Sequence, residues 1–167
     1  MEIVLLESLG ISRELLDSYA KKLEEKGHTF HAYEKDTDPE VQKKRCENAD
    51  VVIIANMPFA DEVIRNCPKL KFIDVAFTGV DHVGLEAAKE KGIAVSNASG
   101  YSNESVAELV LGMMLTLLRN VPQVNKRCRE GGTKDGLVGR EIMGKKIGIV
   151  GTGAIGKRVA QICHGLG

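Results

Sequence analysis

The first hundred residues alternate short apolar runs with amphipathic helical segments, and this alternation constrains the fold more than any other feature. The apolar runs predict strands at 2–6, 28–33, 50–55, 70–76 and 92–97. The segments between them predict helices at 12–26, 39–48, 60–66 and 84–91. Strands that alternate with helices over short connections form βαβ units and a doubly wound parallel sheet. The sequence therefore predicts an α/β fold, with a flavodoxin-like domain over residues 1–98.

Residues 99–167 predict a second region, made of an interdomain helix, a connecting arm and the first βα unit of an incomplete Rossmann domain. The helix over 104–118 is apolar nearly all round, which requires burial on most of its sides. It is either a long central core helix or the contact surface for a second domain or a second subunit. Residues 121–146 are rich in glycine and predict an arm with little core of its own.

A glycine-rich turn lies near the end of the chain, where Gly151, Gly153 and Gly156 form the pattern G-x-G-x-x-G. The apolar run 145–150 before it predicts a strand, and the residues after it predict a helix. In this context the glycines allow a tight turn and close approach of a pyrophosphate to the helix N-terminus. The alternative is a purely structural turn between strand and helix. The acidic residue that binds the ribose, expected about 20 residues further on, would fall beyond Gly167.

Charge and cysteine content exclude several classes of function. Lys plus Arg and Asp plus Glu both number 23, so no net charge favours nucleic acid or an anionic membrane. The longest apolar stretch, 106–118, is interrupted by Glu108 and is shorter than the ~20 residues that span a bilayer. The four cysteines lie far apart without metal-ligand spacing. We therefore expect a cytoplasmic protein with reduced thiols, no metal site, no membrane contact and no nucleic-acid partner.

Two stretches carry a resemblance to a known family. "TGVDHVGLEAAKEKGIAVSNASGYSNESVAELVLGMMLTLLRN", from Thr78, and "GREIMGKKIGIVGTGAIGKRVA", from Gly139, resemble the D-isomer-specific 2-hydroxyacid dehydrogenases. The resemblance runs from about Val51 to the end of the chain. The form "YSNESVAE" is similar to the glycerate dehydrogenase or hydroxypyruvate reductase branch, and phosphoglycerate dehydrogenases belong to the same family.

The resemblance implies an NAD-dependent oxidoreductase that transfers hydride between nicotinamide and a small D-2-hydroxy acid or 2-keto acid. NADP stays open as the cofactor, and the sequence does not select the acid. The implied substrate-binding residues are Thr78, Gly79 and Val80, which act through a backbone loop at the carboxyl end of a strand. Asn56, in the neighbouring loop 56–59, would line the same cleft because ligands of open α/β sheets lie beyond the carboxyl ends of the strands. Without the resemblance, both loops are read as ordinary turns between strand and helix. The implied cofactor-binding residues are Asn103, Gly151, Gly153, Ala154, Ile155 and Gly156. Gly84 stands where the family pattern has an aspartate, a helix cap.

The catalytic His, Glu and Arg that the resemblance implies follow the glycine turn by many residues, and none can be matched in this chain. We therefore expect an N-terminal portion of the enzyme that is inactive alone and that associates as a homodimer, or a larger oligomer, through 104–118. His82 is expected to face solvent, and Asp74 and Asp81 to serve as turn and cap residues. The alternative is a non-enzymatic flavodoxin-like module that binds a small carboxylate or pairs through its apolar helix.

Overall fold

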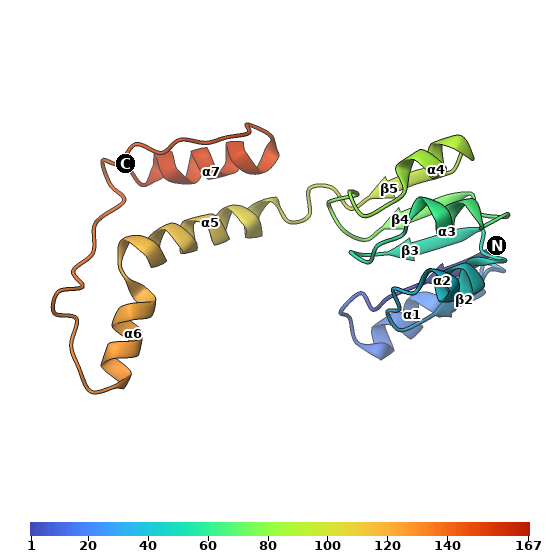
Figure 1. The fold of residues 1–167 in the computed structure, drawn as a ribbon, viewed down its shortest axis with the longest axis horizontal. Helices are drawn as coiled ribbons and strands as arrows, with labels where there is room; N and C mark the ends of the chain where they lie inside the picture. Colours follow the sequence, from blue (N-terminus) through green and yellow to red (C-terminus); the bar gives the residue numbers. More distant parts are fainter. The chain divides into compact units, whose positions relative to one another are not determined.

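A five-stranded parallel sheet is the centre of the first of two units in the computed structural model, which describes all of residues 1–167 (Figure 1). The first unit is Met1–Ser99 and the second is Gly100–Gly167. The strands are β1 (Glu2–Leu5), β2 (Thr29–Ala32), β3 (Val51–Ile54), β4 (Phe72–Val75) and β5 (Ala94–Asn97). Their spatial order is β2-β1-β3-β4-β5, which is the flavodoxin-like order. The predicted α/β fold and doubly wound sheet are confirmed.

Four helices connect these strands: α1 (Arg13–Glu24), α2 (Pro39–Cys46), α3 (Asp61–Arg65) and α4 (Leu85–Glu90). The side chain of Ser12 caps α1 by accepting a hydrogen bond from the backbone N–H of Leu15. Asp38 caps α2 in the same way, and Pro39 occupies the first turn, where its missing N–H is not needed. These local signals explain why the predicted helix starts lie within a residue or two of the observed ones.

The hydrophobic core lies on one face of the sheet, where α2, α3 and α4 pack. It includes alternate residues of the central strands, such as Val52 and Ile54 on β3 and Ile73 and Val75 on β4. All four of these side chains are fully buried. The period of two along each strand places their neighbours on the opposite face. The core therefore fixes the register of the sheet, and with it the positions of the loops at both edges.

The second unit contains three helices: α5 (Asn103–Leu118), α6 (Val121–Arg129) and α7 (Ala154–Gly165). Helices α5 and α7 pack together, and Arg158 Nε donates to Glu104 Oε2 at 2.7 Å. The apolar helix is present as predicted from its sequence. The arm, predicted to have little core of its own, contains the additional helix α6, none of whose residues is buried. Helix α6 forms because Pro122 suits a first helical turn and no glycine occurs before residue 131.

The strand predicted at 145–150 is absent, since these residues form no β-ladder. A strand requires a hydrogen-bonded neighbour, and the second unit contains no other strand. The turn and the helix after it are nevertheless formed as predicted, because α7 begins at Ala154 with Gly153 at its N-cap.

No single helix has the length and hydropathy needed to cross a bilayer. Helices α5 and α6 satisfy the length and composition test only when taken together, and they are bent by 60° at the break between them.

Candidate functional site

Loops that follow β1, β3, β4 and β5 lie at the carboxyl edge of the parallel sheet, where open α/β sheets bind their ligands. The predicted substrate-binding residues fall on two of these loops. Thr78, Gly79 and Val80 follow β4, and Asn56 follows β3. Because β3 and β4 are paired neighbours, the structure brings the two loops side by side.

The loop after β4 is held from β5. The side-chain amide of Asn97 donates to the carbonyl oxygen of Thr78 at 2.6 Å. The backbone N–H of Ala98 is shared between the carbonyl oxygens of Val75 and Phe77, at 3.1 and 3.0 Å. The backbone N–H groups of Gly79 and Val80 donate no hydrogen bond in the structure. This loop is thus anchored through its carbonyl groups and leaves two adjacent donors free, as an anion-binding loop requires.

The loop after β3 (residues 56–59) is anchored from three directions. The buried carboxylate of Glu7 accepts hydrogen bonds from the backbone N–H groups of Ala55 and Met57, both at 2.7 Å. Gln42, also buried, donates through Nε2 to the carbonyl oxygen of Pro58 at 3.2 Å. The backbone of Phe59 forms a parallel bridge with Val83. The loop is therefore rigidly placed against the segment that follows 78–80.

Gly84 is the N-cap of α4, as the sequence predicted, but the cap carboxylate comes from elsewhere in the chain. Asp61, the first residue of α3, accepts a hydrogen bond from the backbone N–H of Ala87 at 2.8 Å. A Cβ at position 84 would lie 2.4 Å from the backbone nitrogen of Asp61 and 2.6 Å from its Oδ1. Glycine at 84 therefore allows Asp61 to cap α4. This hydrogen bond links α3, which follows the loop 56–59, to α4, which follows the loop 78–80.

The remaining acids and histidines form no second site. His82 was expected to face solvent, but its Nε2 atom is buried and has no hydrogen-bond partner. The ring lies partly inside because the bridge at Phe59 and Val83 draws this segment against the loop after β3. Asp74 was expected in a turn, but it lies within β4 and accepts from Ser96 Oγ at 2.8 Å. No group of three or more His, Cys, Asp and Glu side chains is placed to hold a metal ion.

All four cysteines are free thiols. Cys46 and Cys67 are fully buried beside each other under α2 and α3. A hydrogen bond with the Cys67 thiol, together with burial, raises the pKa of Cys46 above its ordinary range. Cys67 itself donates to the carbonyl oxygen of Val63 at 3.2 Å. Both thiols are therefore core groups, and the raised pKa keeps Cys46 in the protonated, unreactive form, whereas the hydrogen bond with Cys46 lowers the pKa of Cys67.

The glycine turn in the second unit has the geometry that a pyrophosphate site needs. Gly151 has φ +95°, which is open to glycine, and a Cβ at Gly156 would lie 2.0 Å from the carbonyl oxygen of Gly151. A Cβ at Gly153 would meet no atom within 4 Å, so the space in front of the helix is open. No side chain caps α7, which leaves the N–H groups of its first turn, including those of Ala154 and Ile155, for an anion. The residues present therefore fit a dinucleotide.

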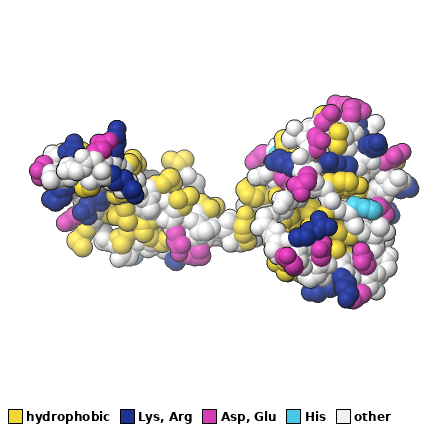
Figure 2. Space-filling view, turned by 90° about the horizontal axis from the view of Figure 1, so that it is seen from below, with side chains coloured by type: hydrophobic (Ala, Val, Ile, Leu, Met, Phe, Trp, Pro, Cys, Tyr) yellow, Lys and Arg dark blue, Asp and Glu magenta, His cyan; other side chains and the backbone are white.

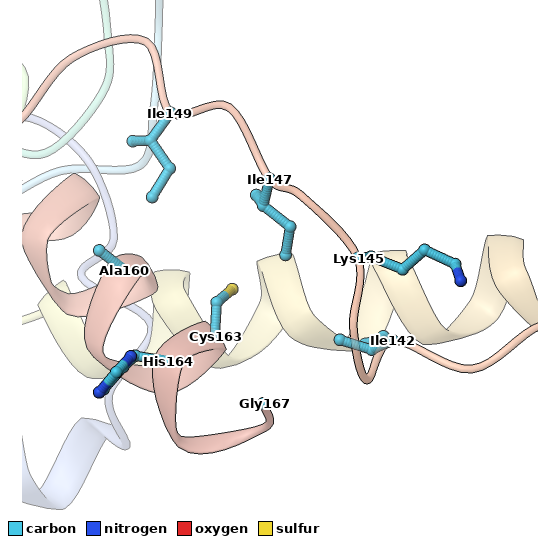
Figure 3. Close-up of a pocket in the computed structure, with 8 residues that line it drawn as sticks. All are labelled: Ile142, Lys145, Ile147, Ile149, Ala160, Cys163, His164 and Gly167. Atoms are coloured by element: carbon cyan, nitrogen blue, oxygen red, sulfur yellow. The ribbon is translucent and has the colours of Figure 1, made fainter.

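Asn103 is the first residue of α5, and its side chain is partly exposed. A separate cavity of about 470 Å³ lies between residues 142–149 and α7. In Figure 3, Ile147 and Ile149 line the cavity from the extended segment before the glycine turn, and Ala160 and Cys163 line it from α7. Alternate residues of 145–150 thus face α7 as they would in a strand, although no ladder forms. The lining combines apolar side chains with the polar side chains of Lys145 and His164.

The sequence predicted where the loops lie but missed the residues that hold them. Glu7, Gln42, Asp61 and Asn97 carry no recognisable motif, and each acts on a backbone segment distant in sequence. For two of them a weak signal exists. Glu7 and Asn97 are polar residues that come at or just after the end of an apolar strand, where side chains reach the ligand edge of the sheet.

Comparison with known proteins gives the family. The model of the D-isomer-specific 2-hydroxyacid dehydrogenase catalytic domain matches residues 3–163. The chain belongs to this family. Within it, a D-3-phosphoglycerate dehydrogenase from Haemophilus influenzae is 35% identical over 170 residues, covering 100% of this chain and 40% of that protein. A glycerate dehydrogenase from Methylorubrum extorquens is 34% identical, covering 82% of this chain and 49% of that protein.

Solved structures of the family agree with the fold. D-lactate dehydrogenase from Aquifex aeolicus, solved with NAD and lactic acid, superposes with a TM-score of 0.85 at 27% identity. The match covers 99% of this chain and 49% of that one. The present chain spans about half or less of the length of the curated relatives that it matches.

Proposed function

We propose that this chain forms the substrate-binding part, and the first pyrophosphate-binding turn, of a nicotinamide-dependent oxidoreductase for small D-2-hydroxy acids or 2-keto acids. The observation that carries the proposal is the pair of free backbone donors at Gly79 and Val80, on a loop whose carbonyl groups are already bonded. Two adjacent N–H groups are suited to a carboxylate, and they lie at the edge of the sheet where ligands bind.

The cofactor side rests on the glycine turn. NAD or NADP, when bound, would supply the nicotinamide that accepts or donates the hydride. Its pyrophosphate would lie against Gly151, Gly153 and Gly156, with the N–H groups of Ala154 and Ile155 directed at it. Asn103 would donate a hydrogen bond near the nicotinamide end. Relatives solved with NAD and with NADPH support this cofactor class.

We expect the chain alone to bind substrate but not to turn over, because the His, Glu and Arg of the family resemblance have no match in it. The test is NMR of the ¹⁵N-labelled 167-residue chain titrated with D-glycerate, together with an assay of NADH oxidation by glyoxylate, hydroxypyruvate or pyruvate. Glycerate should shift the amide signals of Gly79 and Val80, and no steady oxidation should occur. Failure of those two amides to respond would refute the carboxylate site, and steady turnover would refute the inactivity.

The same experiment separates this proposal from a non-enzymatic carboxylate-binding module. NADH added to the chain should shift the amides of Gly153 and Ala154 if the turn belongs to a cofactor site. A purely structural turn would leave them unchanged.

We also propose self-association through α5. Leu109, Met113 and Leu117 on this helix are 61%, 51% and 77% exposed. Figure 2 shows hydrophobic side chains gathered on the face of the second unit that is in view. An exposed apolar helix face of this kind is typical of an interface, and a second copy of the chain is its simplest partner. Light scattering at micromolar concentration should give about twice the 18.1 kDa chain mass; a clean monomer would contradict the proposal.

A further inference from the structure

The backbone donors at the end of β3 are already occupied by an anion that belongs to the chain itself. Glu7 follows β1, the neighbour of β3, and its side chain is only 4% exposed. One of its oxygens, Oε1, accepts from the N–H groups of both Ala55 and Met57 at 2.7 Å. A buried carboxylate between two backbone donors has the arrangement of an occupied anion site, formed internally.

A cation beside this site, Lys35, is neutralised by the same carboxylate. Lys35, which follows β2, places its Nζ 3.4 Å from the second oxygen of Glu7. The same ammonium group donates to Asn56 Oδ1 at 3.1 Å. Lys35 is therefore paired on its inner side, and the cluster of Glu7, Lys35 and Asn56 carries no net charge. The amide of Asn56 faces Lys35 through its oxygen.

This neutral cluster lies where the far end of a bound acid would reach. A substrate held by its carboxylate at Gly79 and Val80 lies one strand away from Asn56, and neighbouring strands are about 4.8 Å apart. The third carbon of a three-carbon acid lies only about 2.5 Å from the carboxylate carbon, so a phosphate carried on that carbon reaches roughly the distance between the strands. A charged group on that carbon would therefore meet a loop in which Glu7 already occupies the N–H donors of Ala55 and Met57. The charge of Lys35 beside this loop is neutralised by the same carboxylate.

We infer that the substrate is a small 2-hydroxy acid whose far end carries no second acidic group, and that Glu7 determines this specificity. The inference rests on the proposed function, because it takes Gly79 and Val80 as the carboxylate site. The relatives of this chain include both a glycerate dehydrogenase and a D-3-phosphoglycerate dehydrogenase. The inference places the chain with the first kind, whose substrate name carries no phosphate. A phosphate placed against the buried carboxylate would juxtapose like charges, which binding sites avoid.

The test compares D-glycerate with D-3-phosphoglycerate by NMR titration of the 167-residue chain and of two variants. Glu7→Gln removes the charge and keeps an oxygen that can accept from Ala55 and Met57. Glu2→Gln makes the same change at the first residue of β1, the strand that Glu7 follows, and Glu2 pairs there with His31. In wild type we expect glycerate to bind at least about tenfold more tightly than phosphoglycerate. Glu7→Gln should reduce that ratio by about tenfold, and Glu2→Gln should leave it unchanged.

A further measurement does not depend on the folding of the variant. Inorganic phosphate at millimolar concentration should leave the amide signals of Ala55 and Met57 in place in wild type, because Glu7 already occupies them. Wild-type affinity for phosphoglycerate equal to or above that for glycerate, or phosphate-induced shifts at Ala55 and Met57, would overturn the inference while the carboxylate site stands. Silence of Gly79 and Val80 toward both acids would overturn the proposed function and this inference with it.

Discussion

Replacement of Gly84 by alanine should destabilise the first unit, although alanine is ordinarily an acceptable change at such a backbone conformation. Gly84 has φ −68°, so no left-handed strain arises. The cost comes from contact, since the new Cβ would lie 2.4 Å from the backbone nitrogen of Asp61. Overpacking costs about 1–3 kcal/mol. Displacing Asp61 would also remove the cap of α4, worth about 0.5–2 kcal/mol. Together these give a loss of about 2–4 kcal/mol in the free energy of unfolding.

Urea unfolding followed on the amide signals of Val52 and Ile73, which report the first unit alone, measures this loss. With a slope of about 2 kcal/mol per molar urea, the midpoint should fall by about 1–2 M. Asp61→Ala serves as the comparison that removes only the cap, so its midpoint should fall by less. Gly112→Ala, in the interior of α5 with no atom within 4 Å of the new Cβ, should instead gain about 0.5–1 kcal/mol in its own unit.

Gly84→Asp makes the argument sharper, because aspartate is the residue of the family pattern at this position. A change toward a family pattern commonly stabilises a protein, but here it would place a second carboxylate against Asp61. We expect a loss larger than that of Gly84→Ala. A urea midpoint for either variant equal to that of wild type would refute the claim that glycine at 84 is needed for Asp61 to cap α4.

Three further predictions follow from the described contacts. Asn97→Ala removes the hydrogen bond to the Thr78 carbonyl and should weaken D-glycerate binding several-fold in the NMR titration, with a stability loss of only about 0.5–1.5 kcal/mol; unchanged affinity would mean that the loop holds itself. Iodoacetamide at pH 8 should label the exposed Cys128 and leave Cys46 unlabelled until the chain unfolds, because contact with a second thiol and burial raise the pKa of Cys46; mass spectrometry of the digested protein distinguishes the two. Hydrogen bonding with the Lys71 ammonium group lowers the pKa of Asp50, so its stabilising contribution is present above the unfolded-state value of about pH 4 and is lost as the pH falls through the lower folded value. Asp50→Asn should therefore flatten the acid limb of a pH–stability curve, and an unaltered limb would contradict this.

Most of the fold could be predicted from the sequence because its signals are local. Each of the five strands is a short apolar run, and helices α1 and α2 begin at recognisable caps. Prediction failed where the outcome depended on partners or on competing signals. The run 145–150 has the composition of a strand but no neighbouring strand with which to pair. Helix α6 was not predicted as a separate element, because the glycines that follow it dominate the composition of residues 121–146.

The candidate site divides in the same way. The positions of the loops at 56–59 and 78–80 follow from the strand ends, which periodicity locates. The side chains that hold those loops do not, because each bond crosses a large separation in sequence. Glu7 lies 50 residues before Met57, and Asp61 lies 26 residues before Ala87. Such side-chain-to-backbone bonds have no period or motif, so only the folded arrangement shows them.

The two loops use their backbone donors in opposite ways, and this contrast bears directly on ligand choice. In the loop after β3, the N–H groups of Met57 and Phe59 are bonded within the chain, to Glu7 and to the carbonyl oxygen of His82. In the loop after β4, bonds fall on carbonyl groups such as that of Thr78, and the donors at Gly79 and Val80 remain available. A buried donor without a partner costs free energy, and the chain supplies a partner for the buried Met57, whereas Gly79 and Val80 are only partly buried and accessible to a ligand. The loop after β3 is occupied by the chain's own carboxylate and the loop after β4 is not, and for this reason we expect the edge of the sheet to receive one acidic group.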